Sequence, residues 1–535
     1  MGKNNYFLII KILFFCFFFL LFFYPIALIL IKSFSMDKSI DLVNILISNE
    51  KLIWNSFFQA TISTFFCLLI GIPAAFIVAR RNFFGKRFVK ALSLIPFVFP
   101  SILVVISFVI VFGNNGWINY FLQNYLFFNN DVQFLYGFSG IILAHTFYNF
   151  PLIMRFVSGS WENLDTTMKE TAKTLGADKI QVFFNVTLKQ LMPSIIAGAS
   201  LVFIYCFMSF AIVISLGGIQ FSTLEVEIYR QITRNLNFSV AGFLALIQFI
   251  ILSLVGLIYF YYSKKYEIKE KVLKEKPKNL SLNSLTGITE TVFLVVMVLF
   301  IVLPIIALIF FAFINPETGQ VSFKAFEKIF FSESKSLSGT TPLLSIFYSL
   351  LLALITSIIA TLMGLIASLK QTRVSIINFF IASSVAVSVI TLAFGYLLGF
   401  GSGNLIVIAL GHSILAFPFS FRVLNNALNK IDLESIDSAR TLGANEIEVF
   451  KKVQFPRIKN ALFVSIAFCF AVSLAELGFV LVLYDGAYAT MPVYIYRLLA
   501  TFDLVAASAM GLMLILVSFI AFYAIELFSK NVRVF

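Results

Sequence analysis

The sequence has few of the residues from which catalytic and metal sites are built. Of its 535 residues only 12% are charged, two are histidine and four are cysteine. No two cysteines form a C-x-x-C pair, so neither a disulfide framework nor a zinc site is supported. The phosphate-binding pattern Gly-x4-Gly-Lys-Ser/Thr is missing, because Gly85-Lys86 lacks the preceding glycine and the following hydroxyl. We therefore expect no metal, no cofactor and no ATP hydrolysis on this chain.

Apolar residues are abundant instead. They make up 60% of the chain, which predicts an all-α, polytopic membrane protein. Runs of about 17–25 apolar residues can cross a bilayer as helices. We place about twelve transmembrane helices, at residues 7–32, 54–79, 88–112, 138–157, 193–215, 239–262, 289–314, 343–369, 374–400, 404–424, 458–484 and 504–528.

The net charge of +13 lies in short loops and not on one soluble domain. It therefore predicts membrane topology, with the lipid bilayer as a partner, and not nucleic-acid binding. If the N-terminus is cytoplasmic, the inner segments hold 30 of the 39 Lys and Arg residues. This asymmetry predicts a multi-pass protein with both termini in the cytoplasm.

One stretch of the sequence occurs twice, at residues 145–189 and 412–456. The copies lie 267 residues apart, align without a gap and share 14 of 45 residues. The two histidines, His145 and His412, fall at the same place in each copy, and we interpret them as hydrogen-bonded structural residues. The repetition predicts two parallel six-helix repeats related by an axis along the membrane normal.

The repeat also predicts the domain organisation. We expect a first transmembrane domain at residues 1–262, with its polar loop at about 158–192. A basic cytoplasmic linker follows at 263–288, and a second transmembrane domain occupies 289–535, with its polar loop at about 425–457.

Each polar loop contains a short predicted helix. Asp165 and Asp432 are good N-caps for it. Gly176 and Gly443 suit the left-handed residue that follows a helix end. Both copies therefore predict a helix, a glycine turn and a second helix on the cytoplasmic face.

The second helix of each loop is predicted to begin after Asp178 or Asn445. The first helix carries Ala172 or Ala439 among polar residues, so it presents a small-residue face that fits a groove on another protein. The alternative is an amphipathic helix lying on lipid, which requires more large apolar residues than these helices have.

The loops also carry the residues of a family motif. The pattern Glu-Ala-Ala-x3-Gly-x9-Ile-x-Leu-Pro marks the permease subunits of type I ABC importers. The first copy reads Glu170-Thr171-Ala172-x3-Gly176-x9-Val186-Thr187-Leu188-Lys189, and the second reads Asp437-Ser438-Ala439-x3-Gly443-x9-Val453-Gln454-Phe455-Pro456. The second lacks the glutamate and the first lacks the final proline, but the glycine spacing and the hydrophobic positions hold in both. The chain thus resembles this family over essentially its full length, in the fused two-domain form of the thiamine and ferric-iron importer permeases.

The resemblance implies partners and a location. The two short helices would be coupling helices, each seated in one of two copies of an ABC ATPase subunit that binds the ATP. A periplasmic or lipid-anchored substrate-binding protein would deliver the cargo to the bacterial cytoplasmic (inner) membrane. The residues implied in ATPase docking are Asp165, Glu170, Ala172, Gly176, Asp432, Asp437, Ala439 and Gly443.

Glu476 stands inside the predicted helix 458–484, where an ionisable group is costly and by default a functional candidate. At the offset of the repeat it matches Ser209, so we expect the two to face each other near the symmetry axis. We predict that they line the translocation path, where an acidic group suits a cationic cargo such as thiamine or ferric iron. A helix–helix hydrogen-bonding contact is the alternative for Glu476.

The predicted function is therefore a permease subunit without catalysis of its own, which takes a small cation into the cytoplasm. Two other classes compete with it. An ion-coupled secondary transporter with two six-helix halves would need several buried carboxylates or arginines. A membrane-embedded enzyme would need a cluster of His, Asp or Glu near one membrane surface.

Overall fold

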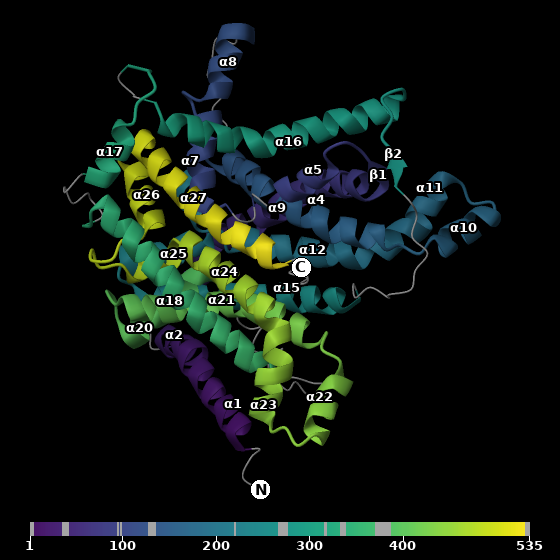
Figure 1. Ribbon diagram of the computed structural model, residues 1–535. Coiled ribbons are helices and arrows are strands. Elements are labelled where there is room, and N and C mark those ends of the chain that lie inside the picture. Colours follow the sequence, from purple (N-terminus) through teal and green to yellow (C-terminus); the bar gives the residue numbers. More distant parts are fainter. Residues whose placement is uncertain are drawn as a thin grey trace. The chain divides into compact units, whose positions relative to one another are not determined.

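The computed structural model is almost entirely helical (Figure 1). It describes residues 5–34, 42–93, 96, 99–126, 135–218, 221–265, 277–314, 318–331, 339–369 and 387–529. In chain order the helices are α1 (Asn5–Phe18), α2 (Tyr24–Phe34), α3 (Leu42–Ser48), α4 (Glu50–Arg80), α5 (Lys86–Leu92), α7 (Ser101–Phe112), α8 (Trp117–Leu126), α9 (Phe138–Glu162), α10 (Thr166–Thr174), α11 (Lys179–Val182), α12 (Leu188–Phe207), α13 (Ala211–Leu216), α14 (Leu224–Thr233), α15 (Phe238–Lys265), α16 (Leu285–Ala312), α17 (Lys324–Phe331), α18 (Pro342–Ser368), α20 (Val389–Phe400), α21 (Leu405–Leu428), α22 (Leu433–Thr441), α23 (Glu446–Val449), α24 (Phe455–Ala475), α25 (Gly478–Leu483), α26 (Met491–Ala500) and α27 (Leu504–Ser529). The remaining elements are the π-helical turns η1 (Phe19–Phe23), η2 (Phe183–Thr187) and η3 (Phe450–Gln454), and the strands β1 (Arg81–Asn82) and β2 (Lys278–Asn279).

Within the described residues, eleven helices are long and apolar enough to cross a membrane. This confirms the prediction of an all-α, polytopic membrane protein. The ninth predicted helix, 374–400, lies outside the described residues up to residue 386, and the shorter helix α20 forms part of the remainder.

Three helices that we predicted as continuous are broken. The segment predicted at 88–112 contains α5 and, after Pro100 in an extended conformation, α7. Proline lacks the amide hydrogen of a helix interior and biases the residue before it away from helix. The segments predicted at 193–215 and 458–484 are each divided into a long and a short helix, α12 with α13 and α24 with α25. These last two breaks occur at equivalent places in the two repeats.

The repeat is more regular in structure than in sequence. The elements from α22 to α26 begin and end 267 residues after those from α10 to α14, except that α24 is one residue longer than α12. Ser56 and Ser349, which match in sequence at an offset of 293, also make the same bond. The Ser56 hydroxyl accepts from the backbone N–H of Leu224, and the Ser349 hydroxyl from that of Met491, both at 2.7 Å. Each serine thus ties its long helix to the first residue of α14 or α26.

The residues group into two compact units. One contains Met1–Ile40, Ile228–Leu246 and Phe311–Phe535, and the other contains Asp41–Glu227 and Ile247–Phe310. The units cut across the predicted domains 1–262 and 289–535, because the first helix of each half belongs to the unit that contains most of the other half. The predicted linker 263–288 lies outside the described residues from 266 to 276.

Aromatic contacts within each unit place these first helices. The rings of Phe14 and Phe18 lie 5.9 and 5.4 Å from the ring of Phe417 in α21. In the other unit, Phe300 of α16 lies 6.3 Å from Phe150, the residue of α9 that matches Phe417 in the repeat. The same position of each repeat therefore receives a phenylalanine from a first helix.

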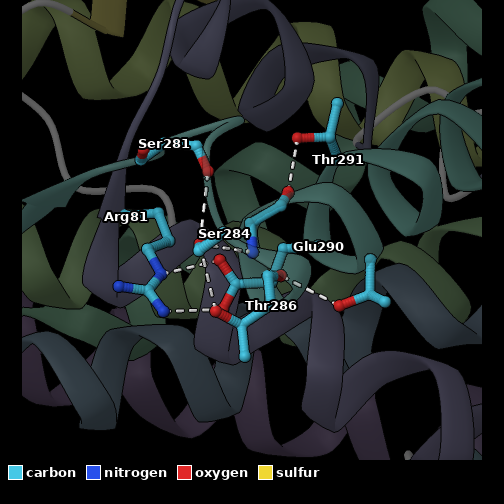
Figure 2. Close-up of polar contacts among 8 residues, drawn as sticks. Arg81, Ser281, Ser284, Thr286, Glu290 and Thr291 are labelled. Carbon is cyan, nitrogen blue, oxygen red and sulfur yellow. Dashed lines mark hydrogen bonds and ion pairs between the residues drawn. The ribbon is translucent and has the colours of Figure 1, made fainter.

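An ion pair joins the C-terminal end of α4 to the start of α16 (Figure 2). Arg81 donates through Nε and Nη2 to the two carboxylate oxygens of Glu290, each at 2.7 Å. Beside it, Arg81 and Asn82 pair in parallel with Lys278 and Asn279. The described end of the linker is thus held on α4.

We expect Glu290→Gln to lower the midpoint of thermal unfolding of the purified protein. The Arg81 and Glu290 side chains are only 23% and 14% exposed, so removing one partner leaves a largely buried charge, at a cost of about 1–2 kcal/mol. The matched control is Glu162→Gln, which breaks the half-exposed pair between Lys90 and Glu162 and should change the midpoint little. Equal midpoints for both variants would contradict this role of the Arg81 pair.

Candidate functional site: the repeated loops and the helix breaks

The first copy of the polar loop lies at the end of the two long helices, α9 and α12, that it connects (Figure 1). Asp165 caps α10, because its side chain accepts from the backbone N–H of Thr167 at 2.9 Å. The backbone and side-chain hydrogen bonds of Thr167 hold the pKa of the Asp165 carboxyl below its ordinary value. Gly176 follows with φ of 86°, and Asp178 forms a capping box with Gln181 at the start of α11. The predicted helix, glycine turn and second helix are confirmed here.

The second copy repeats this geometry. Gly443 has φ of 88°, close to the value at Gly176, and Asn445 forms a capping box with Glu448 at the start of α23. A side chain with a Cβ is strained in this left-handed region, which explains a glycine at the same place in both copies.

Asp432 departs from its prediction in one respect. It stands at the N-cap position of α22, but its side chain makes no capping hydrogen bond. In the first copy the capped residue is Thr167, whose hydroxyl also bonds the aspartate, whereas the second copy has Glu434 at that position. A carboxylate there offers no donor and repels the aspartate.

Both first helices carry an ion pair between equivalent residues. Lys173 bonds Glu170 at 2.8 Å, and Arg440 bonds Asp437 at 3.0 Å. Arg440 also bonds Glu446, and this hydrogen bond is the main reason that its guanidinium pKa is raised. The acidic residues of the motif therefore stabilise their own helices, and as exposed pairs they contribute little.

Each first helix is tied back to the membrane helix that follows it. Gln190 donates to the sulfur of Met168 at 3.0 Å, and Arg457 donates to the hydroxyl of Ser435 at 3.3 Å. These two contacts join equivalent positions of the repeat. The turns between them, η2 and η3, are π-helical in both copies, and π-turns are frequent at functional sites.

The apolar residues on the outside of the loops were not predicted. Leu175 and Leu442 are 83% and 88% exposed, and Ile180 and Ile447 are also exposed. Ala439, in contrast, is half-buried against the loop's own cluster around Ile436, and Ala172 is likewise half-buried. The sequence signal was present, because the same leucine and isoleucine stand in both copies of an otherwise polar segment.

Ser209 and Glu476 lie in the breaks after the two long helices α12 and α24. Both are half-buried, and each is described within its own unit. Glu476 has an extended backbone, and its Oε1 accepts from the amides of Gly478 at 2.8 Å and Phe479 at 3.3 Å. This carboxylate therefore caps α25. The prediction that Ser209 and Glu476 face each other stays a prediction.

The two histidines are buried and hydrogen-bonded. His145 Nδ1 lies 3.1 Å from the Ser63 hydroxyl, and His412 Nδ1 lies 2.8 Å from the Ser473 hydroxyl. Both are 1% exposed. These contacts fit structural residues, as predicted.

A buried carboxylate was missed. Glu225 of α14 is fully buried and accepts from Gln248 Nε2 at 2.5 Å. At the offset of the repeat it aligns with Pro492, so the comparison of the two halves hides it.

Comparison with known proteins finds one matching family model and several similar permease proteins. A family model described as "Binding-protein-dependent transport system inner membrane component" matches residues 68–266 and 372–534, so each match contains one polar loop. The thiamine transport system permease protein ThiP of Escherichia coli (strain K12) is 26% identical over 500 residues, which cover 89% of either chain. ThiP of Haemophilus influenzae is 25% identical over 495 residues, 87% of this chain and 86% of that protein. The molybdenum transport system permease protein ModB of Haemophilus influenzae is 31% identical over 144 residues, 27% of this chain and 61% of that protein.

Proposed function

Because this chain belongs to the family of binding-protein-dependent transport system inner membrane components, as a type I ABC importer permease with the family domain twice, we propose that it carries thiamine into the cytoplasm. In this proposal a separate ATPase, present in two copies, binds and hydrolyses the ATP. A periplasmic or lipid-anchored binding protein delivers the cargo, and both termini lie in the cytoplasm. The observation that carries the proposal is the pair of polar loops at equivalent places in the two repeats, each with a glycine turn and a capped helix.

The choice of thiamine rests on two supports. The two ThiP relatives reported above align with more than four fifths of this chain and carry thiamine in their names. Glu476 offers a half-buried carboxylate at a helix break, which suits an organic cation. Ferric iron, the other cargo that the motif resemblance implies, is our second choice.

The loops are the proposed seats of the ATPase. Glycine turns of the same φ fix the angle between α10 and α11 and between α22 and α23. The exposed Leu175 and Leu442 beside these turns supply apolar area that a partner buries. The motif residues Asp165, Glu170, Ala172 and Gly176, with Asp432, Asp437, Ala439 and Gly443, then act mainly by shaping these helices.

The breaks at Ser209 and Glu476 are the proposed lining of the translocation path. Transporters commonly bind cargo where a membrane helix is interrupted, because the backbone there departs from helical pairing. When ATP binding draws the two ATPase subunits together, the loops move with them and the path opens to the outside. Hydrolysis of the ATP then returns the path to its starting state.

The alternative that we predicted, an ion-coupled secondary transporter, is disfavoured by the family of this chain, although the buried Glu225 adds to the carboxylates that such a mechanism would use. Glu225 is engaged by Gln248 inside one unit, and ion coupling does not explain why both loops present the same exposed leucine. We therefore place the ATP-driven function first.

The test of the cargo is to isolate the assembled complex from membranes, recover the binding protein that accompanies it, and titrate that protein with thiamine and with ferric citrate. Heat of binding for thiamine alone supports the proposal. Binding of ferric iron alone would show that the cargo is ferric iron and not thiamine. Purification without any binding protein or ATPase would contradict the importer assignment itself.

A further inference from the structure

A cluster of five polar side chains lies inside the unit that contains α4, α9 and α12. Gln59 and Ser63 come from α4, His145 and Asn149 from α9, and Cys206 from the last turn of α12. Each is 2% exposed or less. The mechanism proposed above uses none of them, although Cys206 stands three residues before Ser209.

The five side chains form one connected network. Gln59 Nε2 donates to the Cys206 carbonyl at 2.8 Å, and Asn149 Nδ2 donates to the Cys206 sulfur at 3.4 Å. Ser63 bonds both the Cys206 thiol and His145 Nδ1. The Cys206 carbonyl belongs to the last turn of α12 and also accepts from the backbone N–H of Ser209 at 3.3 Å, a long bond that leaves its second lone pair for Gln59. Gln59 therefore caps the end of α12 from the neighbouring helix.

Three atoms of this network have no partner within the described chain: Gln59 Oε1, Asn149 Oδ1 and His145 Nε2. Buried polar atoms without partners are rare and often mark an internal water. If the Ser63 hydroxyl donates to Nδ1, the neutral imidazole carries its proton on Nε2. By donor and acceptor type, a single water would satisfy all three atoms, because it would accept from Nε2 and donate its two hydrogens to the two amide oxygens.

The other repeat lacks this site. Leu352 and Ala416 replace Gln59 and Asn149, and Ser473 replaces Cys206. There the rings of His412 and Phe479 lie 5.4 Å apart in an edge-to-face arrangement. The break after α24 is held from its other side, by the Glu476 carboxylate on the amides of α25. The residue that matches Glu476 is Ser209, and the cap position of α13 has no side-chain hydrogen bond.

We propose that Gln59, Asn149 and His145 bind an internal water molecule, and that Gln59 is the positioning residue that holds the α12–α13 break as Glu476 holds the break before α25. The same interruption of a helix is thus stabilised from opposite sides in the two repeats. The site itself does not depend on the transport assignment, whereas its effect on the path beside Ser209 rests on the proposed function.

The test uses the residues of the second repeat as replacements in the intact complex. Gln59→Leu should speed hydrogen exchange at the backbone amides of residues 208–210 about tenfold, the factor that corresponds to losing about 1.4 kcal/mol from one buried hydrogen bond. Exchange at residues 476–478 should stay unchanged and serves as the internal control. Adding Ser209→Glu to Gln59→Leu should restore most of the protection, because a carboxylate there can cap α13.

The water is tested separately, in a density map of the complex that resolves ordered waters. We expect one peak within hydrogen-bond distance of all three atoms in the wild type and no peak in Asn149→Ala. Unchanged exchange in Gln59→Leu, or failure of Ser209→Glu to restore protection, would overturn the positioning role. A wild-type map without a peak at this site, or with a peak ligated like a metal cation, would overturn the proposed water site.

Discussion

Replacing both Leu175 and Leu442 by aspartate is expected to lower ATP-driven uptake about a hundredfold or more while the protein still folds in the membrane. The two side chains are 83% and 88% exposed, so their removal costs this chain no packing of its own. Burial of each leucine in a partner contributes about 1.5–3 kcal/mol, and a hundredfold loss corresponds to about 2.7 kcal/mol. The measurement is uptake by cells, with the amount of ATPase retained on the purified protein.

The control for this double variant is Leu285→Asp. Leu285 is 79% exposed at the start of α16, outside both loops, so its replacement should leave ATPase retention unchanged. Each single variant, Leu175→Asp or Leu442→Asp, should retain part of the ATPase because the other loop is intact. Normal uptake and ATPase retention in the double variant would show that these loops are not the docking sites.

The second large effect is expected for Glu476→Gln, which should reduce thiamine uptake by about tenfold to a hundredfold. A glutamine keeps the oxygen that accepts from Gly478 and Phe479, so the cap of α25 survives while the negative charge is lost. A hydrogen bond to a charged group contributes about 1.5–3 kcal/mol, which sets the size of the effect. Uptake and the midpoint of thermal unfolding are measured together.

Glu476→Ala separates the two roles of this residue. It removes both the charge and the cap, so it should lower uptake at least as far and also destabilise the protein by about 0.5–2 kcal/mol. If Glu476→Gln transports normally and only Glu476→Ala is impaired, Glu476 is a capping residue and does not line the path.

Local chemistry predicted the loops well. Asp165, Asp178 and Asn445 were identifiable because a short polar side chain before a helix satisfies free backbone amides. Gly176 and Gly443 were identifiable because only glycine adopts a positive φ at little cost. The gapless repeat carried each inference from one copy to the other.

Long-range packing was not predictable in the same way. The runs 193–215 and 458–484 are predominantly apolar on both sides of each break, so hydropathy could not reveal the breaks that place Ser209 and Glu476 outside helices. The break after α12 is held by a contact from another helix, that of Gln59 with the Cys206 carbonyl. Likewise, an apolar first helix can pack on either half, and it is contacts such as that of Phe18 with Phe417 that decide between them.

The most direct test of the central claim is uptake by proteoliposomes that contain this protein, its ATPase and its binding protein. We predict that labelled thiamine accumulates only with ATP on the ATPase side, without any ion gradient, and that an ATPase unable to hydrolyse ATP abolishes accumulation. Accumulation driven by a proton or sodium gradient in the absence of the ATPase would contradict the account and support the ion-coupled alternative.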